Sequence, residues 1–546
     1  MSKPLLVALA LGSLLKLHAA PADTDHPVLK GVTPVDDPAQ AAAHLAVAPG
    51  LRADLWAAEP DLENPVSFCF DERGRCFVAE TFRRKSSSLD IRAHQPWLSQ
   101  SLAMRSVADR LAFLQSAFAD QKTAPFLGLV DRNHDGRLDW RDLAVESERI
   151  RLLEDRAGRG RADHSEIFAD GFNTAVTGIG AGVLARGGDV FFTCLPDLWK
   201  LRESEPAGGR SSGDAGSGRP PAPASQELRP PGETEAQFPN RTFAGNVAAL
   251  RQDVRPQREP LLSGFGVHIT FSGHDLHGLV FGPDGKLYWS SGDCGARVTT
   301  KEGRVLDVAD TGAVFRANPD GTECEIVMRG LRNPEELCFN DVGDLFTADN
   351  NADGGDLARW VQVVEGGDAG WQIGFQALPG LGSWIAEKLW SPDIARTALA
   401  LLPPVGTIGH GPAGIACYPG TGLPDAWRDH FFVCDFPGGV RAFTQSPRGA
   451  SWQLDAPPGV LHDNGYEMRN KLVWGFYPTD VDFGVEGGAY VLDWTRDVEK
   501  PGQGRIFRLH DPATDESAIV RETKRLLGEG MSGRGPEELA KLLGHA

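Results

Sequence analysis

The chain has 546 residues, of which 41% are hydrophobic and 24% charged, and its formal net charge is −19. These proportions are ordinary for a soluble globular protein, and the length allows either one large β architecture or several domains. An acidic surface repels phosphate backbones, and no basic stripe with interleaved aromatic residues occurs, so nucleic-acid binding is excluded as a function.

The first 22 residues predict an export signal. Lys3 gives a basic start, the apolar run Leu5–Leu15 is too short to cross a bilayer, and Ala20-Pro-Ala22 offers small residues for cleavage. Residues 23–49 would then form an N-terminal extension of the mature protein. No later stretch is long and apolar enough for a transmembrane helix. We therefore expect an exported protein, either periplasmic or at the cell surface.

One type of hairpin recurs six times between residues 50 and 510. Each copy has a short apolar strand, a tight turn rich in Asp and Gly, and a second strand. In the clearest copy, Pro283 presets φ for the turn and Gly285 can adopt the left-handed conformation that closes it. The copies are Val66–Val78, Gly182–Phe192, Gly278–Trp289, Glu336–Phe346, Gly414–Cys434 and Asp480–Tyr490. They predict an all-β, six-bladed propeller with one blade per copy.

Two insertions interrupt the repeat, and a helical segment follows it. Residues 83–151 contain a helical pattern with apolar residues near one face, namely Leu102, Val107, Leu111 and Leu114. Residues 203–237 are dense in Gly, Pro, Ser and Ala, which predicts a disordered surface loop. Residues 511–546 form a C-terminal segment with helices expected at 516–528 and 536–543. This segment is consistent with the start of a helical domain truncated here.

The first insertion contains a loop that fits the EF-hand pattern. Gly136 would make its sharp turn, and the twelfth position is Asp142 where Glu is usual, so the last ligand has a shorter reach. The predicted ligands are Asp131, Asn133, Asp135, the carbonyl of Arg137, Asp139 and Asp142. We predict a structural calcium site that holds this EF-hand-like insertion together.

The eight cysteines suit an oxidising compartment without fixing any disulfide. Cys69 and Cys76 flank one turn, and Cys417 and Cys434 lie in successive strand-like segments. Each pair could form a disulfide or consist of small buried apolar residues. No Cys-x-x-Cys-His sequence occurs, so this chain carries no covalently attached c-type haem.

Several motifs resemble those of the soluble quinoprotein glucose/sorbosone dehydrogenases. They include the family's central blade, its Arg-Asn-Pro signature, its Gly-Gly-x-x-Gly-Trp motif and its closing strand. The matching segments are Gly278–Asp293, Gly330–Leu337, Gly366–Trp371 and Gly504–Leu509. The opening segment Ala57–Thr81 is more specifically similar to the large "membrane-bound dehydrogenase" propellers of planctomycetes and verrucomicrobia. Those propellers often continue into helical repeats and a cytochrome c domain.

The resemblance implies oxidation of a sugar or related alcohol with pyrroloquinoline quinone and calcium, with electrons passing to a cytochrome c or another external acceptor. A base takes the hydroxyl proton while hydride moves to the quinone. His274 falls on the family's base, Arg332 on the arginine that stabilises the quinone oxygen, and Asn333 on an adjoining polar contact. His277 is the alternative histidine, as base or as cofactor contact. Either histidine could instead only hold its loop in place by hydrogen bonds.

The resemblance also places a calcium-binding loop between these motifs and Gly-Gly-x-x-Gly-Trp. The loop contains Asp349, Asp353 and Asp356, whose carboxylates are hard oxygen ligands suited to calcium. Asp356 stands where the family has a carboxylate ligand. A polar surface turn is the alternative interpretation of each of these residues.

The sequence departs from the family where two arginines clamp the quinone. Tyr477 and Thr479 stand in place of the Arg-x-Arg that precedes Asp-Val in the family. The change removes charge-assisted contacts worth roughly 1.5–3 kcal/mol each when desolvated. Arg83, Arg84 and Arg441 are candidate substitutes.

Two other functions therefore remain open. The first is a lactonase-type hydrolase in which calcium activates water. The second is a non-catalytic propeller that binds a carbohydrate or a protein partner. The loss of the arginine clamp favours these alternatives, while His274 and Arg332 favour the oxidoreductase, and the fold alone does not decide. The oxidoreductase requires His274, Arg332 and Asp356 to meet at the mouth of one axial channel.

Overall fold

The computed structural model describes residues 32–542, except residues 123, 204–255, 394–400, 458, 466, 497 and 498. The predicted export signal lies outside the described residues, and so does the Gly- and Pro-rich loop apart from residue 203.

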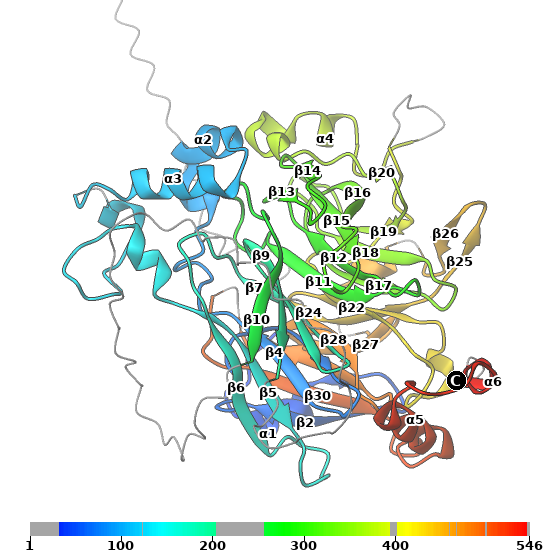
Figure 1. The fold of residues 1–546 in the computed structure, drawn as a ribbon. Helices are drawn as coiled ribbons and strands as arrows, with labels where there is room; N and C mark the ends of the chain where they lie inside the picture. Colours follow the sequence, from blue (N-terminus) through cyan, green and yellow to red (C-terminus); the bar gives the residue numbers. More distant parts are fainter. Residues whose placement is uncertain are drawn as a thin grey trace, which may run out of the picture.

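Six sheets of mainly antiparallel strands form the blades of a propeller around a central axis (Figure 1). The first three blades are β3 (Pro65–Phe70), β4 (Cys76–Glu80), β5 (Glu148–Glu154), β6 (His164–Phe172); β7 (Gly180–Arg186), β8 (Asp189–Cys194), β9 (Asp197–Arg202), β10 (Gln257–Ser263); and β11 (Leu276–Phe281), β12 (Leu287–Ser291), β15 (Gly312–Ala317), β16 (Glu325–Leu331), extended by β20 (Gly367–Asp368).

The other three blades complete the ring. They are β17 (Pro334–Phe339), β18 (Leu345–Asp349), β19 (Arg359–Val363), β21 (Gly406–Thr407); β22 (Pro412–Cys417), β23 (Phe431–Asp435), β24 (Gly438–Phe443), β27 (Lys471–Phe476), extended by β1 (Ala46–Val47); and β28 (Pro478–Phe483), β29 (Ala489–Asp493), β30 (Arg505–His510), β2 (Arg52–Ala58). The six-bladed fold predicted from the repeat is confirmed.

Each recurring hairpin is the inner pair of strands of one blade. The inner strands β3, β7, β11, β17, β22 and β28 contact one another in this order, and β28 contacts β3. Gly285 closes its hairpin with φ +79°, as its turn pattern predicts. Gly278 in β11 has φ +27°, and a Cβ there would lie 2.7 Å from Cα of Glu336 in β17. A glycine therefore allows two inner strands to approach closely.

The ring closes by pairing both ends of the propeller segment. β2 pairs antiparallel with β30, from Arg52 opposite His510 to Ala58 opposite Arg505. The sixth blade therefore takes its outer strand from the beginning of the segment and its three inner strands from the end. Because a closed ring leaves only short protected edges, this pairing stabilises the whole assembly.

The insertion after β4 is helical, as its pattern predicts. It contains α2 (Leu98–Ala103) and α3 (Val107–Ala117), and the Ser106 hydroxyl caps α3 by accepting the Asp109 N–H at 3.2 Å. Leu114 and Phe118 pack in a separate apolar cluster with Ile269, beside the propeller. The chain rejoins the first blade at β5, so the insertion ends before residue 148 rather than at residue 151.

Two helices follow the last strand. α5 (Ala518–Glu529) buries Val520 and Leu526, and α6 (Pro536–Leu542) follows it, close to the predicted ranges. The remaining elements are α1 (Pro38–Ala41), α4 (Ser383–Ala386), the ribbons β13 (Ala296–Thr299) with β14 (Val305–Val308) and β25 (Gln445–Arg448) with β26 (Ser451–Leu454), and the 3₁₀ turns η2 (Ala42–His44), η3 (Ile91–Trp97), η4 (Ala124–Leu127), η5 (Trp140–Ala144), η6 (Ile373–Ala377), η7 (Pro379–Leu381), η8 (Asp425–Trp427) and η9 (Val460–His462). Among the described helices, none combines the length and the apolar character needed to cross a membrane.

All eight cysteines have free thiols, and seven of them are buried. Cys69 lies opposite Phe77 and Cys76 opposite Phe70, so these two cysteines are not cross-strand partners. Cys417 and Cys434 are also unpaired with each other. The interpretation as small apolar core residues therefore describes them, and the disulfide alternative does not.

Candidate functional site

A cavity of about 290 Å³ lies on the propeller axis. Its walls come from the starts of all six inner strands and from residues 271–274, which precede β11. His274, His277, Arg332, Asn333 and Asp353 all line it, so the structure brings together most of the residues predicted for the site. The size is near the lower end for small-molecule pockets.

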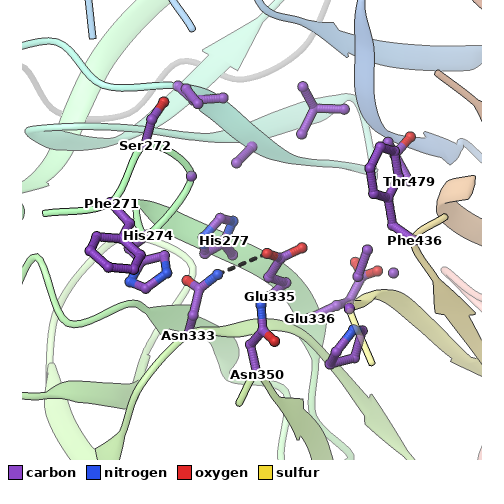
Figure 2. Close-up of a pocket in the computed structure, with 18 of the residues that line it drawn as sticks. Phe271, Ser272, His274, His277, Asn333, Glu335, Glu336, Asn350, Phe436 and Thr479 are labelled. Atoms are coloured by element: carbon purple, nitrogen blue, oxygen red, sulfur yellow. Dashed lines mark hydrogen bonds between the residues drawn. The ribbon is translucent and has the colours of Figure 1, made fainter. Parts of the chain in front are cut away.

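His274 is held by a buried carboxylate. Its Nδ1 lies 2.7 Å from Oδ1 of Asp293, whose Oδ2 accepts the Nε1–H of Trp371 at 2.9 Å (Figure 2 shows His274 beside the cavity). Nδ1–H therefore donates to Asp293, which leaves Nε2 as the basic nitrogen. This histidine–carboxylate arrangement is the one that orients a general base.

The electrostatics of the pair favour a neutral imidazole and an ionised aspartate. Burial lowers the pKa of His274 and Arg332 lowers it further, while Asp293 opposes both effects. Burial alone would raise the pKa of Asp293, but His274, Arg332 and Trp371 hold it below its usual value. At neutral pH, His274 can therefore accept a proton.

His277 is arranged differently from His274. Its Nε2 accepts the backbone N–H of Asp275 at 3.2 Å, and burial together with His274 lowers its pKa to about 4. The ring is therefore neutral at physiological pH, and one of its nitrogens is already engaged. This geometry favours His274 over His277 as the base.

Arg332 brings a positive charge to the cavity wall. Its guanidinium lies 5.3 Å from the centre of the Phe271 ring and 5.6 Å from the Trp371 ring, and Nη1 donates to the carbonyl of Asn351. Its Nε and Nη2 are buried without a hydrogen-bond partner. Because unpaired buried donors are costly, they mark a place where a ligand oxygen would be stabilised.

Asn333 hydrogen-bonds to an acidic residue that the motifs did not single out. Its Nδ2 donates to Oε1 of Glu335 at 2.8 Å, as the dashed line in Figure 2 shows. Burial raises the pKa of Glu335 to about 8, against the lowering effect of Arg84. Glu335 is therefore mostly protonated at neutral pH.

The loop predicted to bind calcium is organised by other contacts. Asp349 accepts the backbone N–H groups of Arg332 and Asn333 and forms a buried ion pair with Arg359. These contacts show Asp349 holding the backbone of the site, and its role as a metal ligand stays a prediction. The sequence could not reveal Arg359 as its partner.

The other two aspartates of this loop have different surroundings. Asp356 is 4% exposed, and its carboxylate accepts the N–H groups of Ala352 and Gly354 and the Nε1–H of Trp384 at 2.7 Å. It closes the loop and does not line the cavity, unlike the exposed Asp353. Of the three residues expected to meet at the channel, only His274 and Arg332 therefore do so. Within the described residues, no three His, Cys, Asp or Glu side chains converge as a metal cluster.

Arg84, one of the proposed substitutes for the missing arginine clamp, reaches the cavity, where Arg92 also lies. Arg83 instead donates to the carbonyl groups of Thr177, Glu146 and Thr174, and Arg441 pairs with buried Asp435. Arg83 and Arg441 are therefore structural. The cavity keeps three arginines, Arg84, Arg92 and Arg332, along its walls.

The side chains of the EF-hand-like loop hydrogen-bond mainly to the backbone of the same loop. Oδ2 of Asp131 accepts the N–H of Gly136 at 3.1 Å, and Gly136 has φ +80°, as predicted for the sharp turn. Asp142 is fully buried and accepts the N–H groups of Arg132, Asn133 and Asp139. In this described loop the other side chains also bond locally, so the carboxylates do not converge as a ready-made metal cluster.

Three residues important for the cavity were missed as site residues. Asp293 ends the segment Gly278–Asp293, whose resemblance assigns it no role, although its place just after β12 and near the segment of His274 is a signal for one. Glu335 and Glu336 follow the Arg-Asn-Pro signature and begin β17, so their position at an inner strand was the available signal. Their mutual arrangement depends on the ring and could not be predicted.

Fold and cavity together define a six-bladed propeller with a buried histidine–aspartate pair in its axial cavity. Residues 266–439 match the family described as Glucose / Sorbosone dehydrogenase, and residues 37–209 match a Domain of unknown function (DUF7133). The segment that matches the glucose/sorbosone dehydrogenase family contains His274, Asp293 and Arg332. No curated protein matches the sequence.

Solved structures with a similar course of the chain include three bacterial proteins. A putative oxidoreductase (glucose dehydrogenase) of Thermus thermophilus is 15% identical, with a TM-score of 0.43 over 84% of this chain and 99% of that chain. The PQQ-bound aldose sugar dehydrogenase of Streptomyces coelicolor is 13% identical (TM-score 0.41; 85% and 99%). The apo aldose sugar dehydrogenase of Escherichia coli is 12% identical (TM-score 0.41; 84% and 99%).

Proposed function

We propose that the protein is an oxidoreductase that oxidises a sugar or related alcohol with a quinone cofactor. The observation that carries this proposal is the 2.7 Å contact between His274 Nδ1 and Asp293 in a cavity shared with Arg332. The match of residues 266–439 to the glucose/sorbosone dehydrogenase family supports it. The same match supports a small-molecule substrate.

The residues divide the chemistry between them. Nε2 of His274 takes the proton of the substrate hydroxyl, and Asp293 holds the ring and stabilises the imidazolium that results. Arg332 stabilises negative charge that develops on an oxygen near its unpaired Nε and Nη2. A quinone supplies the hydride acceptor when it is bound.

The cavity suits an anionic cofactor such as pyrroloquinoline quinone. Arg84, Arg92 and Arg332 line it despite Tyr477 and Thr479 at the family's arginine positions, although Arg92 already pairs with Asp90 at 2.7 Å. Two nitrogens of Arg332 lack any partner, which is the strongest sign that an acceptor group belongs there. These arginines would hold the cofactor.

We also propose that calcium binds the EF-hand-like loop and stabilises the insertion. Oδ1 of Asp131 is a buried carboxylate oxygen without a hydrogen-bond partner, although Oδ2 is already bonded to Gly136. A bound cation would satisfy this oxygen. A modest rearrangement must bring Asp135 and Asp139 toward it, because both carboxylates now accept backbone N–H groups.

The broader setting is part of the same proposal. We propose that the protein is exported to the periplasm or cell surface and is of the planctomycete and verrucomicrobial "membrane-bound dehydrogenase" type. A cytochrome c is then the natural electron acceptor. The N-terminal sequence and the similarity of Ala57–Thr81 to those propellers support this setting.

Reconstitution tests the oxidoreductase. The purified protein is incubated with pyrroloquinoline quinone and calcium, and reduction of an electron-accepting dye is followed with a panel of sugars and polyols. We expect quinone-dependent activity that His274→Asn lowers roughly 10²–10⁴-fold, the usual contribution of a general base. His277→Asn is the matched control and should retain much more activity.

Failure of this test has a defined meaning. If the protein binds no quinone, or if His274→Asn is as active as the unmodified protein, the proposal is wrong. Calcium-dependent hydrolysis of sugar lactones without quinone would identify the lactonase alternative. Sugar binding without turnover of either kind would identify a binding propeller.

A further inference from the structure

The cavity has an acidic wall formed by Glu336, Asp480 and Ser67. Figure 2 shows Glu336 and Thr479, the neighbour of Asp480, on the side of the cavity opposite His274. We propose that this acidic wall binds a primary ammonium group, so that the substrate is an amino sugar or amino alcohol. The inference rests on the proposed function, whose substrate class it narrows.

The two carboxyl groups of the acidic wall are held by backbone donors. Oε2 of Glu336 accepts the N–H of Ile415 at 3.0 Å, while Asp480 accepts the N–H groups of Phe68 at 2.8 Å and Val481 at 2.7 Å. Glu336 and Asp480 also hydrogen-bond to each other, which requires a proton between them. Their positions are thus fixed by three neighbouring inner strands.

Ser67 is an independent indication that a ligand belongs here. It is 6% exposed and lines the cavity, and its Oγ is buried without any hydrogen-bond partner. It directly precedes Phe68, whose N–H binds Asp480. A buried hydroxyl without a partner is unfavourable, so a donor that enters the cavity would be stabilised at this oxygen.

Gly414 gives the acidic wall its shape. It lies in β22, between the strands of Glu336 and Asp480, and a Cβ there would be 2.2 Å from Oδ1 of Asp480. Any other residue would push this carboxyl group away. The glycine therefore allows the two carboxyl groups to approach each other.

The charges favour a cation as the occupant of the acidic wall. Among the described residues, no lysine or arginine forms a salt bridge with Glu336 or Asp480, whereas both are largely removed from bulk water. Placing two carboxyl groups together in such surroundings forces them to share a proton. A cation can replace this proton, which then leaves to solvent, and can pair with both carboxylates.

An ammonium group fits better than a metal ion. A primary ammonium has three N–H donors, and the acidic wall offers three kinds of acceptor, one each from Glu336, Asp480 and Ser67. Calcium requires six to eight oxygen ligands, and in the described part of the chain no third carboxylate or histidine joins the pair.

The position of the acidic wall relative to His274 completes the inference. A hydroxyl group at one end of the substrate would lie at His274, while an ammonium at the other end would lie between Glu336 and Asp480. Such an arrangement orients the substrate for proton removal. Hexosamines combine both groups in one molecule.

Calorimetric titration of the full-length protein with glucosamine, glucose and N-acetylglucosamine tests the proposal. N-Acetylglucosamine is the matched probe, because it keeps the nitrogen but has no charge. We expect glucosamine to bind at least about tenfold more tightly than the other two, as charge-assisted hydrogen bonds imply. Glu336→Gln should abolish this preference, whereas Glu335→Gln, the control at a neighbouring carboxyl group, should retain it.

A second variant covers the case in which Glu336→Gln does not fold. Ser67→Ala removes only one oxygen, and we expect it to reduce the preference for glucosamine several-fold. Equal binding of the three sugars, or an unchanged preference in Ser67→Ala and Glu336→Gln, would overturn the proposal. Competition by calcium or magnesium chloride at the same site would also overturn it, in favour of a metal site.

The outcome is separable from that of the proposed function. Preferential binding of glucosamine without quinone-dependent oxidation would support the ammonium site and contradict the oxidoreductase. Quinone-dependent oxidation of glucose and glucosamine with equal affinity would support the oxidoreductase and contradict the ammonium site.

Discussion

At the scale of single residues, two histidines three positions apart have different environments. His274 bonds through Nδ1 to an ionised aspartate, whereas Nε2 of His277 accepts a backbone N–H. Spacing in the sequence could place both histidines near the site but could not show which of them is the base. The ranking depends on Asp293, which reaches His274 only because β12 returns along β11.

The pH dependence of the reaction should reflect this environment. Burial and Arg332 lower the pKa of His274, so the imidazole stays neutral below its ordinary value near 6.5. We expect kcat to persist as the pH falls below this value. Asp293→Asn removes the charge that raises the pKa, so the acid limb should move to still lower pH while the maximal rate falls. A profile of kcat between about pH 4.5 and 8 checks both, and an acid limb that moves upward would contradict the assignment.

The acidic residues of the site show where prediction from sequence fails. Three aspartates of one loop cannot be distinguished in the sequence. In the structure, Asp349 pairs with Arg359, Asp353 is exposed at the cavity and Asp356 closes the loop. Their oxygens are distinguished by partners that approach from other segments. Such partners follow from three-dimensional packing, which a single sequence does not encode in local spacing.

At the scale of elements, the hairpin repeat was sufficient to predict the fold. Alternating apolar residues, turn glycines and blade-sized spacing each have a local physical cause, and all six inner hairpins are found where expected. The insertion was predicted less well at its end, because the polar strand β5 (Glu148–Glu154) looks like a continuation of the charged loop before it.

The close approach of two inner strands predicts the effect of a methyl group. Gly278→Ala would place a Cβ 2.7 Å from the Glu336 backbone at φ +27°, and we expect a loss of about 2–4 kcal/mol in unfolding free energy. Gly285→Ala is the matched control, since its Cβ would have no neighbour within 4 Å. Its cost should be about 1–2 kcal/mol, from the left-handed φ alone. Denaturant titration measures both, and equal losses would contradict the steric explanation.

In the EF-hand-like loop, one aspartate holds the backbone and another is the proposed calcium ligand. Asp142 holds three N–H groups, so Asp142→Ala should destabilise the insertion by about 2 kcal/mol with or without calcium. Asp131→Asn should matter mainly when calcium is present, because the unpaired oxygen is the proposed ligand. Limited proteolysis of the insertion with calcium or a chelator distinguishes them. A calcium-independent loss in Asp131→Asn would argue against the metal site.

At the scale of the whole molecule, buried carboxyl groups couple stability to pH. Burial raises the pKa of Glu148 to about 7 and that of Asp275 and Asp493 to about 6. A raised folded-state pKa gives stability that is complete below the unfolded value near 4 and is lost as the pH rises through about 6 to 7. The overall charge of −19 also lowers the stability of the folded state as the pH rises, through repulsion between like charges.

Thermal unfolding should therefore depend on pH in a defined sense. We expect Tm to be a few degrees higher near pH 5 than near pH 8, on the order of the shift that 1–2 kcal/mol produces in a chain of this size. Asp493→Asn keeps the oxygen that accepts two backbone N–H groups and should reduce the dependence. A Tm that rises from the acidic to the alkaline end of this range would contradict this explanation.

The pairing of β2 with β30 also sets the order in which the protein can be completed. The strand that closes the ring is synthesised near the beginning, and its partner only after the rest of the propeller. Until then the first strand has no sheet to join, and the axial cavity has no complete wall. The proposed export would gain from this delay, since no finished ring can form while the last blade is still missing.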